Sequence, residues 1–296
     1  ALGAFAALAW TAIEALRGYL FSGFPWLPFA AALAPWPLAI QGASVVGAFG
    51  LSGLVAGCGV WLAGPGAAPR AAAALTLALL AAHGAWSLAK PVETTGTFNA
   101  ALIQGNIDQA AKWDPQTLSR AVQTYVDLSK SVLASKPDLI VWPETALTFF
   151  VQEPSAQSSM AQAFAAFSGA ALVAGAPGYE RRGRDADIFN RAYLITGEGP
   201  GAFYDKDHLV PFGEYAPFGK DIPILSELMQ GVGAFTPGEK TAPLRSGRLA
   251  MGMLICYESI FPGLAQARVA DGANVLVNIS NDAWFGRSAA PRQHLE

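Results

Sequence analysis

Residues 249–280 read LAMGMLICYESIFPGLAQARVADGANVLVNIS, and this stretch decides the class of the fold. The apolar runs at 249–255 and 273–280 are typical of buried strands, and the segment around 260–270 between them has a helical pattern. Strands that alternate with helices predict a layered α/β domain. The same alternation continues upstream, with strands predicted at 98–104, 138–142, 170–175 and 188–196 and helices at 115–134 and around 156–168.

The distribution of charge divides the chain in two. Residues 1–90 hold four charged side chains, whereas residues 91–296 hold the other 37 of the 41. We therefore predict a membrane part at 1–90 and a globular domain at 91–296. This distribution excludes a fully soluble enzyme and a disordered chain. The net charge of −3 gives no reason to expect a nucleic-acid partner.

Three apolar segments are candidate membrane spans, so we expect about three transmembrane helices. Segments 38–63 and 71–89 reach the length of about 20 residues that a bilayer core needs, and segment 1–16 is borderline. Gly53 and Gly57 have the spacing of a close helix–helix contact, although glycine is frequent in membrane helices for other reasons too.

The connections between these segments indicate an orientation. Residues 17–37 are rich in Trp, Tyr and Pro, which is typical of a loop at the membrane surface, either as an aromatic belt or as the lip of a lipid-binding site. The short loop at 64–70 carries Arg70, and positive charge weakly favours a cytoplasmic location for it. In that case the loop at 17–37 and everything after Lys90 lie on the outer face.

Four clusters of polar residues interrupt the apolar strands, each at a strand end. Glu144 follows one strand, where partial desolvation suits a general base, although an acid at a helix start gives the same pattern. Lys206 lies in a charged segment that is either a solvated loop or the source of a fixed cation for an oxyanion. Cys256 is either a small buried side chain or a nucleophile activated by a nearby base or cation. Asn281 belongs to a cluster that shapes a turn or lines a pocket.

A Glu, a Lys and a Cys at strand ends, in this order, resemble the catalytic residues of the nitrilase, or carbon–nitrogen hydrolase, superfamily. The motifs WPE, YDKDHLVPFGEYAP, ICYE and NISNDAWFG, followed by QH and preceded by membrane spans, more narrowly resemble the apolipoprotein N-acyltransferase family of the bacterial inner membrane. The segments LRGYLFSGFPW and QGNIDQAAKW extend the resemblance along the whole chain.

This resemblance implies a transmembrane part followed by an α-β-β-α sandwich. It implies Glu144 as the general base, Lys206 as the oxyanion stabiliser and Cys256 as the nucleophile. It also implies supporting or substrate-binding roles for a further set of residues, with Trp26 near the entrance for lipid. We expect the two acids of this set to hold Lys206 or Glu144 by hydrogen bonds, the alternative being simple surface acids. The supporting set is Glu214, Glu258, Tyr257, Trp113, Trp26 and Asn281.

The implied reaction is transfer of an acyl chain from a phospholipid, through a thioester on Cys256, to the N-terminal amine of a diacylglyceryl-cysteine in a lipoprotein. The implied cycle is ping-pong and uses no metal or cofactor. The implied location is the bacterial inner membrane, with the catalytic domain on the periplasmic face. Acyl-chain substrates agree with the membrane part, which a soluble nitrilase would not need.

Two other functions remain possible from the sequence. One is a membrane-tethered amidase that uses the same triad and resolves the acyl-enzyme with water. The other is a non-catalytic scaffold that binds lipid or lipoprotein, against which the intact Glu, Lys and Cys argue. The family has more spans before the domain and more strands after it, so we expect the chain to be a fragment truncated at both ends.

Overall fold

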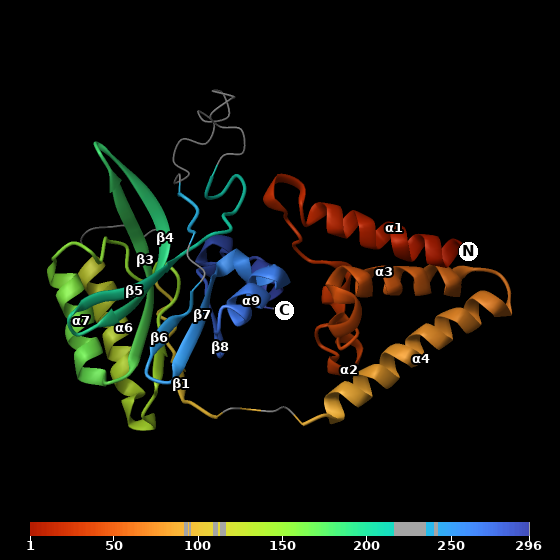
Figure 1. Cartoon of the computed structure of the whole chain (residues 1–296), viewed down its shortest axis with the longest axis horizontal. Coiled ribbons are helices and arrows are strands. Elements are labelled where there is room, and N and C mark those ends of the chain that lie inside the picture. The colour runs from red at the N-terminus through yellow and green to blue at the C-terminus, as the bar shows by residue number, and fades with distance from the viewer. Residues whose placement is uncertain are drawn as a thin grey trace. The chain divides into compact units, whose positions relative to one another are not determined.

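The computed structural model describes residues 1–91, 94, 96–108, 112, 117–215, 235–239 and 242–295 (Figure 1). The chain divides into two compact units, and each is described by itself. One unit is helical and contains Ala1–Thr95 and Arg292–Glu296. The other contains Gly96–Pro291 and is built on two β-sheets.

Two helices of the first unit are long and apolar enough to cross a membrane. They are α3 (Ala43–Ala63) and α4 (Ala67–Ala89), with mean hydropathies of 1.9 and 1.5. They coincide with the second and third predicted spans, although α3 is shorter than predicted because α2 (Pro37–Ile40) is a separate helix. Helix α1 (Leu2–Arg17) has 16 residues and is shorter than both.

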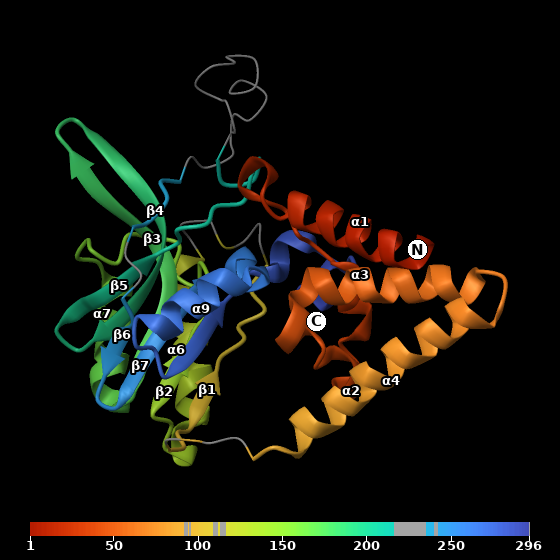
Figure 2. The same cartoon turned by 45° about the vertical axis from the view of Figure 1, so that its right-hand side comes forward.

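Helix α3 packs closely against α1, which runs alongside it in Figure 2. A Cβ atom on Gly57 would lie 2.8 Å from the carbonyl oxygen of Gly3, and one on Gly53 would overlap Thr11 and the backbone of Ala7. The close helix contact predicted from the spacing of Gly53 and Gly57 is therefore present. It depends on the absence of side chains at these two positions.

Two charged residues near the end of α1 hold the loop that follows it. Glu14 is only 3% exposed, and its Oε1 accepts hydrogen bonds from the Trp10 indole at 3.0 Å and from the backbone N–H of Phe29 at 2.7 Å. One turn further along, Arg17 Nη2 donates to the carbonyl oxygen of Trp26 at 2.9 Å. The loop is thus fixed to α1 by side chains of both charges.

The same loop is also attached to α3. The hydroxyl of Ser52, on α3, accepts a hydrogen bond of 2.8 Å from the backbone N–H of Ala30. The loop forms two 3-10 turns: η1 (Leu20–Ser22) precedes the attachment at Trp26, and η2 (Phe29–Leu33) contains the attached residues Phe29 and Ala30. The loop predicted at the membrane surface therefore has a defined conformation.

The second unit contains a larger and a smaller sheet. In the larger sheet the order is β1-β2-β3-β4-β5; β1, β2 and β3 are parallel, and β4 is antiparallel to β3 and β5. In the smaller sheet the order is β6-β7-β8; β7 is antiparallel to β6 and parallel to β8. The strands are β1 (Ala100–Leu102), β2 (Leu139–Val141), β3 (Ala171–Arg182), β4 (Asp185–Thr196), β5 (Gly199–Asp205), β6 (Leu244–Ser246), β7 (Leu249–Ile255) and β8 (Val275–Ile279).

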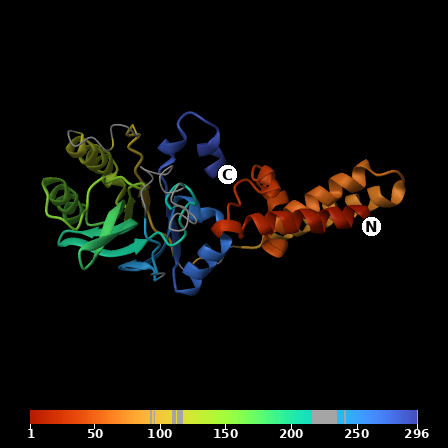
Figure 3. The same ribbon diagram turned by 90° about the horizontal axis from the view of Figure 1, so that it is seen from above.

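The two sheets face each other between layers of helices. Helices α6 (Leu118–Ser131) and α7 (Ala156–Ser168) cover the outer face of the larger sheet, and α9 (Pro262–Ala270) packs on the smaller sheet, as Figure 3 shows from above. Between the sheets, a buried apolar layer includes Val173 of β3 and Met253 of β7. The predicted α-β-β-α sandwich is confirmed.

The other described elements after residue 96 are short. The 3-10 turn η4 directly follows β7 and begins at Cys256, so the predicted nucleophile lies at the junction of a strand and a turn. The remaining short elements are η3 (Leu133–Ser135), η4 (Cys256–Ile260), η5 (Asp282–Phe285) and α10 (Ala290–Leu295).

Candidate active site

Three strand ends bring the predicted catalytic residues into one site. Glu144 comes shortly after β2, Lys206 directly follows β5 and Cys256 directly follows β7. The Lys206 ammonium interacts electrostatically with both Glu144 and Cys256. A carboxylate, a cation and a thiol thus share one environment between the two sheets, although they are far apart in sequence.

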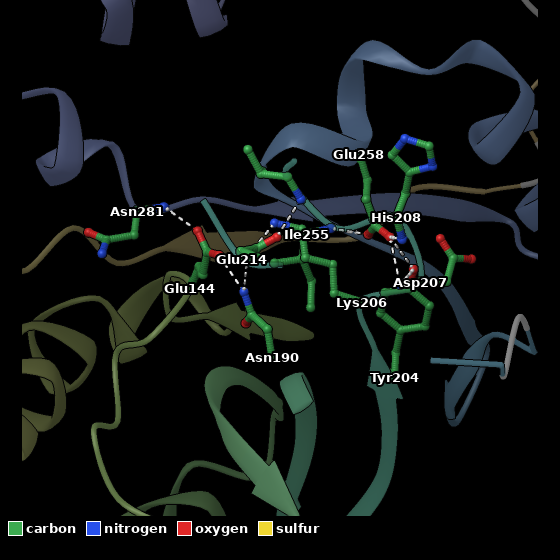
Figure 4. Close-up of polar contacts among 11 residues, drawn as sticks. Glu144, Asn190, Tyr204, Lys206, Asp207, His208, Glu214, Ile255, Glu258 and Asn281 are labelled. Carbon is green, nitrogen blue, oxygen red and sulfur yellow. Dashed lines mark hydrogen bonds and ion pairs between the residues drawn. The ribbon is translucent and has the colours of Figure 1, made fainter. Parts of the chain in front are cut away.

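The Glu144 carboxylate is buried and held at both oxygens (Figure 4). Oε1 accepts a hydrogen bond from Asn190 Nδ2 at 2.7 Å, and Oε2 accepts one from the backbone N–H of Asn281 at 2.9 Å. The backbone of Glu144 lies directly against β3, because a Cβ atom on Gly175 would be 2.6 Å from Glu144 Cα. Packing against β3 therefore fixes the position of the Glu144 backbone, and two hydrogen bonds fix the position of its carboxylate.

The Lys206 ammonium is buried and paired with Glu214. Nζ donates to Glu214 Oε1 at 2.8 Å, and Asn190 Nδ2 donates to the same oxygen at 3.1 Å. Burial acts to lower the pKa of Lys206, but the negative charges of Glu144 and Glu214 outweigh this effect, and the pKa is raised. Lys206 is therefore a permanent cation. The hydrogen bond expected between Glu214 and Lys206 is present.

Cys256 occupies a sharp turn between β7 and η4, with a left-handed backbone φ of 54°. Burial raises the pKa of its thiol to about 12, and the charge of Glu144 acts in the same direction. The Lys206 cation and a side-chain hydrogen bond between Ser280 and the thiol act in the opposite direction. The thiol is consequently neutral near neutral pH, so attack by the sulfur requires a base that removes its proton.

The Glu258 carboxylate is fully buried and accepts four hydrogen bonds (Figure 4). Its Oε1 accepts from the Tyr204 hydroxyl at 2.8 Å and from the backbone N–H groups of Asp207 at 2.9 Å and His208 at 3.0 Å. Its Oε2 accepts from the backbone N–H of Ile255 at 2.7 Å. One side chain thus joins the backbone after β5 to the last residue of β7.

These contacts correct the expectation that Glu258 holds Lys206 or Glu144 by a hydrogen bond. Its partners are the backbone amides beside Lys206 and Cys256 and one tyrosine, because η4 turns its carboxylate toward the end of β5. Burial and the neighbouring Asp207 carboxylate raise the pKa of Glu258 to about 8, while the amide donors act in the opposite direction.

The other predicted supporting residues lie in different places. Tyr257 is buried, and its ring packs edge-on against Phe261 with ring centroids 5.1 Å apart. Asn281 reaches the site through its backbone N–H, which binds the Glu144 carboxylate. Trp26 belongs to the helical unit and stacks on Phe24. Trp113 lies outside the described residues.

Asn190 was not predicted as a site residue, and Ser280 was predicted only as part of the polar cluster that shapes a turn or lines a pocket. Asn190, on β4, donates to two carboxylates at once, and Ser280 binds the Cys256 sulfur. The sequence holds a signal for the first, because Asn190 and Arg191 form a polar pair within an otherwise apolar strand. Over the described ranges, no three His, Cys, Asp or Glu side chains are grouped as metal ligands would be.

Comparison with known proteins identifies the family. The family model for carbon–nitrogen hydrolases matches residues 99–296, which is most of the chain. The chain belongs to this family. Within the carbon–nitrogen hydrolases, this chain also carries a match at residues 2–61 to the N-terminal domain of apolipoprotein N-acyltransferase.

The curated relatives of this chain carry one name, apolipoprotein N-acyltransferase, in the three examples that follow. An apolipoprotein N-acyltransferase of Geobacter metallireducens is 40% identical, over 97% of this chain and 58% of that protein. The proteins of the same name from Caulobacter vibrioides and Brucella suis are 38% and 36% identical, over 99% and 95% of this chain. The resemblance expected from the motifs is confirmed. The chain spans rather more than half the length of these relatives, 56–58% of each.

Proposed function

We propose that this carbon–nitrogen hydrolase chain acts in an apolipoprotein N-acyltransferase, and that it transfers an acyl chain through Cys256. The observation that carries the proposal is the meeting of three strand ends, where the buried Lys206 is hydrogen-bonded to Glu214 and lies close enough to Glu144 and Cys256 for its charge to act on both. The proposal is supported by the names of the curated relatives and by two helices apolar enough to cross a membrane.

In the first half of the reaction, Cys256 attacks the ester carbonyl carbon of a phospholipid. Glu144 accepts the thiol proton as the new carbon–sulfur bond forms, since the raised pKa of the thiol keeps it protonated beforehand. The Lys206 ammonium stabilises the oxyanion of the tetrahedral intermediate. The carbon–oxygen bond then breaks, Glu144 returns the proton to the leaving oxygen, and a lysophospholipid departs. A thioester remains on Cys256.

In the second half, the α-amine of a diacylglyceryl-cysteine attacks the thioester. Glu144 accepts a proton from the amine, and Lys206 again stabilises the oxyanion. The carbon–sulfur bond breaks, and the thiolate recovers a proton as the amide product leaves. Because each substrate reacts in turn with Cys256, the cycle is ping-pong.

The remaining parts of the proposal concern location. The first 90 residues would lie in the bacterial inner membrane, and residues from 91 onward would form the catalytic domain on the periplasmic face. Both substrates carry acyl chains, which agrees with an active site that opens at the level of the bilayer. The aromatic loop that contains Trp26 would line the entrance for lipid.

Intact mass spectrometry of the purified full-length protein tests the proposal. After incubation with phospholipid and no acceptor, we expect a mass gain of one acyl chain. The gain should be absent in Cys256→Ala and retained in the matched control Cys58→Ala, since Cys58 is buried in α3. A diacylglyceryl-cysteine peptide should remove the adduct and appear as the N-acylated product.

Three other outcomes would overturn the proposal. An adduct that water alone removes rapidly would indicate the amidase-like hydrolase. A folded protein that binds lipid and forms no adduct would indicate the scaffold. Loss of the adduct in Cys58→Ala but not in Cys256→Ala would show that the acylated residue is Cys58, in the helical unit.

A further inference from the structure

Arg268 is a buried arginine on α9, and it contacts segments from both sheets. It is 1% exposed. Its Nε donates to the carbonyl oxygen of Met253 in β7 at 3.0 Å. Its Nη2 donates to the Tyr204 hydroxyl at 2.6 Å and to Asp207 Oδ2 at 2.8 Å. One guanidinium therefore connects α9, the strand that leads to the cysteine and the chain around the lysine.

The residues that Arg268 contacts are close in sequence to Lys206 and Cys256. Tyr204 and Asp207 flank Lys206, and Met253 precedes Cys256 by three positions. The hydrogen bonds of Arg268 go to these neighbours, and neither Lys206 nor Cys256 is among its partners. Arg268 is thus placed to act on the two reacting groups only through the chain that carries them.

The carboxylate of Glu258 completes a connected group, which we call the Arg268 cluster: Arg268, Tyr204, Asp207 and Glu258. The Tyr204 hydroxyl accepts from Arg268 and donates to Glu258. Glu258 in turn binds the backbone N–H groups of Asp207 and Ile255. The chain beside Lys206 is therefore linked to the chain beside Cys256 twice, once through the Arg268 guanidinium and once through the Glu258 carboxylate.

The charges of the cluster make Arg268 its essential member. Glu258 is fully buried and Asp207 is partly exposed, and the Arg268 guanidinium pairs with Asp207 and acts electrostatically on Glu258. A planar guanidinium donates in several fixed directions, which a lysine ammonium on a flexible stem does not reproduce. An apolar side chain at 268 would leave Asp207 without its ion pair and would remove the donor to the buried Tyr204 hydroxyl.

We propose that Arg268 is a positioning residue that sets the place of the Lys206 ammonium relative to the Cys256 sulfur. The inference rests on the proposed function, because the lysine and the cysteine matter together only where an oxyanion forms on an acyl group bound to sulfur. It extends that function to a residue on α9 that touches neither substrate nor reacting atoms.

Alkylation of Cys256 by iodoacetamide separates positioning from simple loss of stability. The Lys206 cation favours the thiolate, so a displaced ammonium makes the thiol less acidic and alkylation slower. Local unfolding would instead expose Cys256 and make alkylation faster. The two explanations thus predict changes of opposite sign, and the assay requires no lipid.

The experiment uses the protein with Cys58→Ala, which leaves Cys256 as the one cysteine in residues 1–296. At about pH 8.5 we expect Arg268→Met to slow alkylation by at least about threefold and Arg268→Lys to slow it less. We expect the maximal rate of acyl-adduct formation from phospholipid to fall by about tenfold to a hundredfold, with the half-saturating phospholipid concentration unchanged. Tyr204→Phe, which removes a single hydroxyl, provides a milder test. It should slow both alkylation and acyl-adduct formation, as Arg268→Met does.

Phe164→Leu is the control for stability, because Phe164 lies in the core between α7 and the larger sheet. It should lower the melting temperature without slowing alkylation. Alkylation of Arg268→Met or Tyr204→Phe at or above the unmodified rate would overturn the proposal. If the variants slow alkylation but phospholipid forms no adduct even on the unmodified protein, the proposed function fails and the positioning of Lys206 by Arg268 stands.

Discussion

Asn190 Nδ2 lies 2.7 Å from Glu144 Oε1 and donates a hydrogen bond to it. The same nitrogen donates to Glu214 Oε1, so both of its hydrogens are used, each on a different acid. Glu214 in turn accepts from Lys206. The amide thus lies between two carboxylates, and three successive hydrogen bonds connect the predicted base, through Asn190 and Glu214, to the predicted cation.

Substitution of Asn190 tests this connection. Asn190→Ala removes a donor from the buried Glu144 and the partly buried Glu214, and we expect acyl-adduct formation to slow by about tenfold. Asn190→Asp places a third carboxylate between the two, and we expect a loss of about a hundredfold. Intact mass spectrometry against time measures both rates. Gln157→Ala removes an amide donor at the surface and should keep the normal rate; an active Asn190→Asp variant would contradict the role of the amide.

The raised pKa of Cys256 predicts the pH dependence of its reactivity. Since the pKa is about 12, the thiolate fraction should rise by about tenfold for each pH unit between about pH 7 and 10, without a plateau. The measurement is the rate of iodoacetamide alkylation in Cys58→Ala protein. A plateau near pH 7 would show that the thiolate is already formed in the resting site.

The neighbours of Cys256 should change this rate in opposite directions. The Glu144 charge raises the pKa of the thiol, so Glu144→Gln should alkylate faster at a given pH. Lys206 lowers that pKa, so Lys206→Met should alkylate more slowly. Both variants should lose acyl-adduct formation. Changes of the same sign in the two variants would refute the electrostatic account of the site.

The close approach of β3 to Glu144 predicts a severe effect of a single methyl group. In Gly175→Ala the added Cβ would lie 2.6 Å from Glu144 Cα and 2.8 Å from the carbonyl oxygen of Pro143. Backbone atoms cannot yield as a side chain does, so we expect a loss of about 1–3 kcal/mol in stability and a large loss of adduct formation. Thermal melting and mass spectrometry measure the two. Gly263→Ala, where a Cβ meets nothing within 4 Å, is the matched control and should be neutral.

Glu258 predicts a dependence of stability on pH. The pKa of Glu258 is about 8 in the folded protein and 4.5 for an ordinary Glu, so the folded state keeps a proton that the unfolded chain releases. This stabilisation is complete below about pH 4.5 and is lost as the pH rises through about 8, with a slope of at most about 1.4 kcal/mol per pH unit. Melting temperatures of Glu258→Gln should fall less over this window than those of the unmodified protein.

A variant without a titratable change gives the control for that experiment. Phe164→Leu should lower the melting temperature by a similar amount at every pH. If Glu258→Gln shows the same slope as the unmodified protein, another group is responsible for the pH dependence.

The loop after α1 predicts an effect in the helical unit. Glu14→Ala removes the acceptor for the backbone N–H of Phe29 and for the Trp10 indole. An unpaired buried donor costs about 1–3 kcal/mol, so the peptide that contains Phe29 should exchange its amide hydrogens faster. Ser44→Ala, which removes an exposed hydroxyl, should leave exchange there unchanged. Unchanged exchange in Glu14→Ala would show that Arg17 and Ser52 are sufficient.

The fold could be predicted where periodicity and packing agree. The helix predicted around 156–168 is α7, and the strand predicted at 249–255 is β7. Strand β5 was not predicted, because Gly199, Gly201 and its charged end do not form an apolar run. The hairpin of β3 and β4 extends well beyond its apolar residues, since backbone hydrogen bonding continues where side chains are exposed.

The site could be predicted only in part. Glu144, Lys206 and Cys256 stand at strand ends with unusual neighbours, and these local signals mark them. The partners of Glu258 depend on how η4 approaches the end of β5, and no local pattern contains that information. Asn190 and Arg268 each lie inside a regular element, where polar residues are easily assigned to the surface.

The buried charges around Cys256 have a consequence for the energetics of catalysis. With a neutral thiol, the site contains the carboxylates of Glu144 and Glu214 and the ammonium of Lys206. When the proton passes from the sulfur to Glu144, the total charge of this group does not change. Deprotonation of the thiol by Glu144 therefore leaves the total charge of the site unchanged and requires no counter-ion from solution. Acylation should for this reason be insensitive to ionic strength, even in a membrane whose surface potential varies with salt.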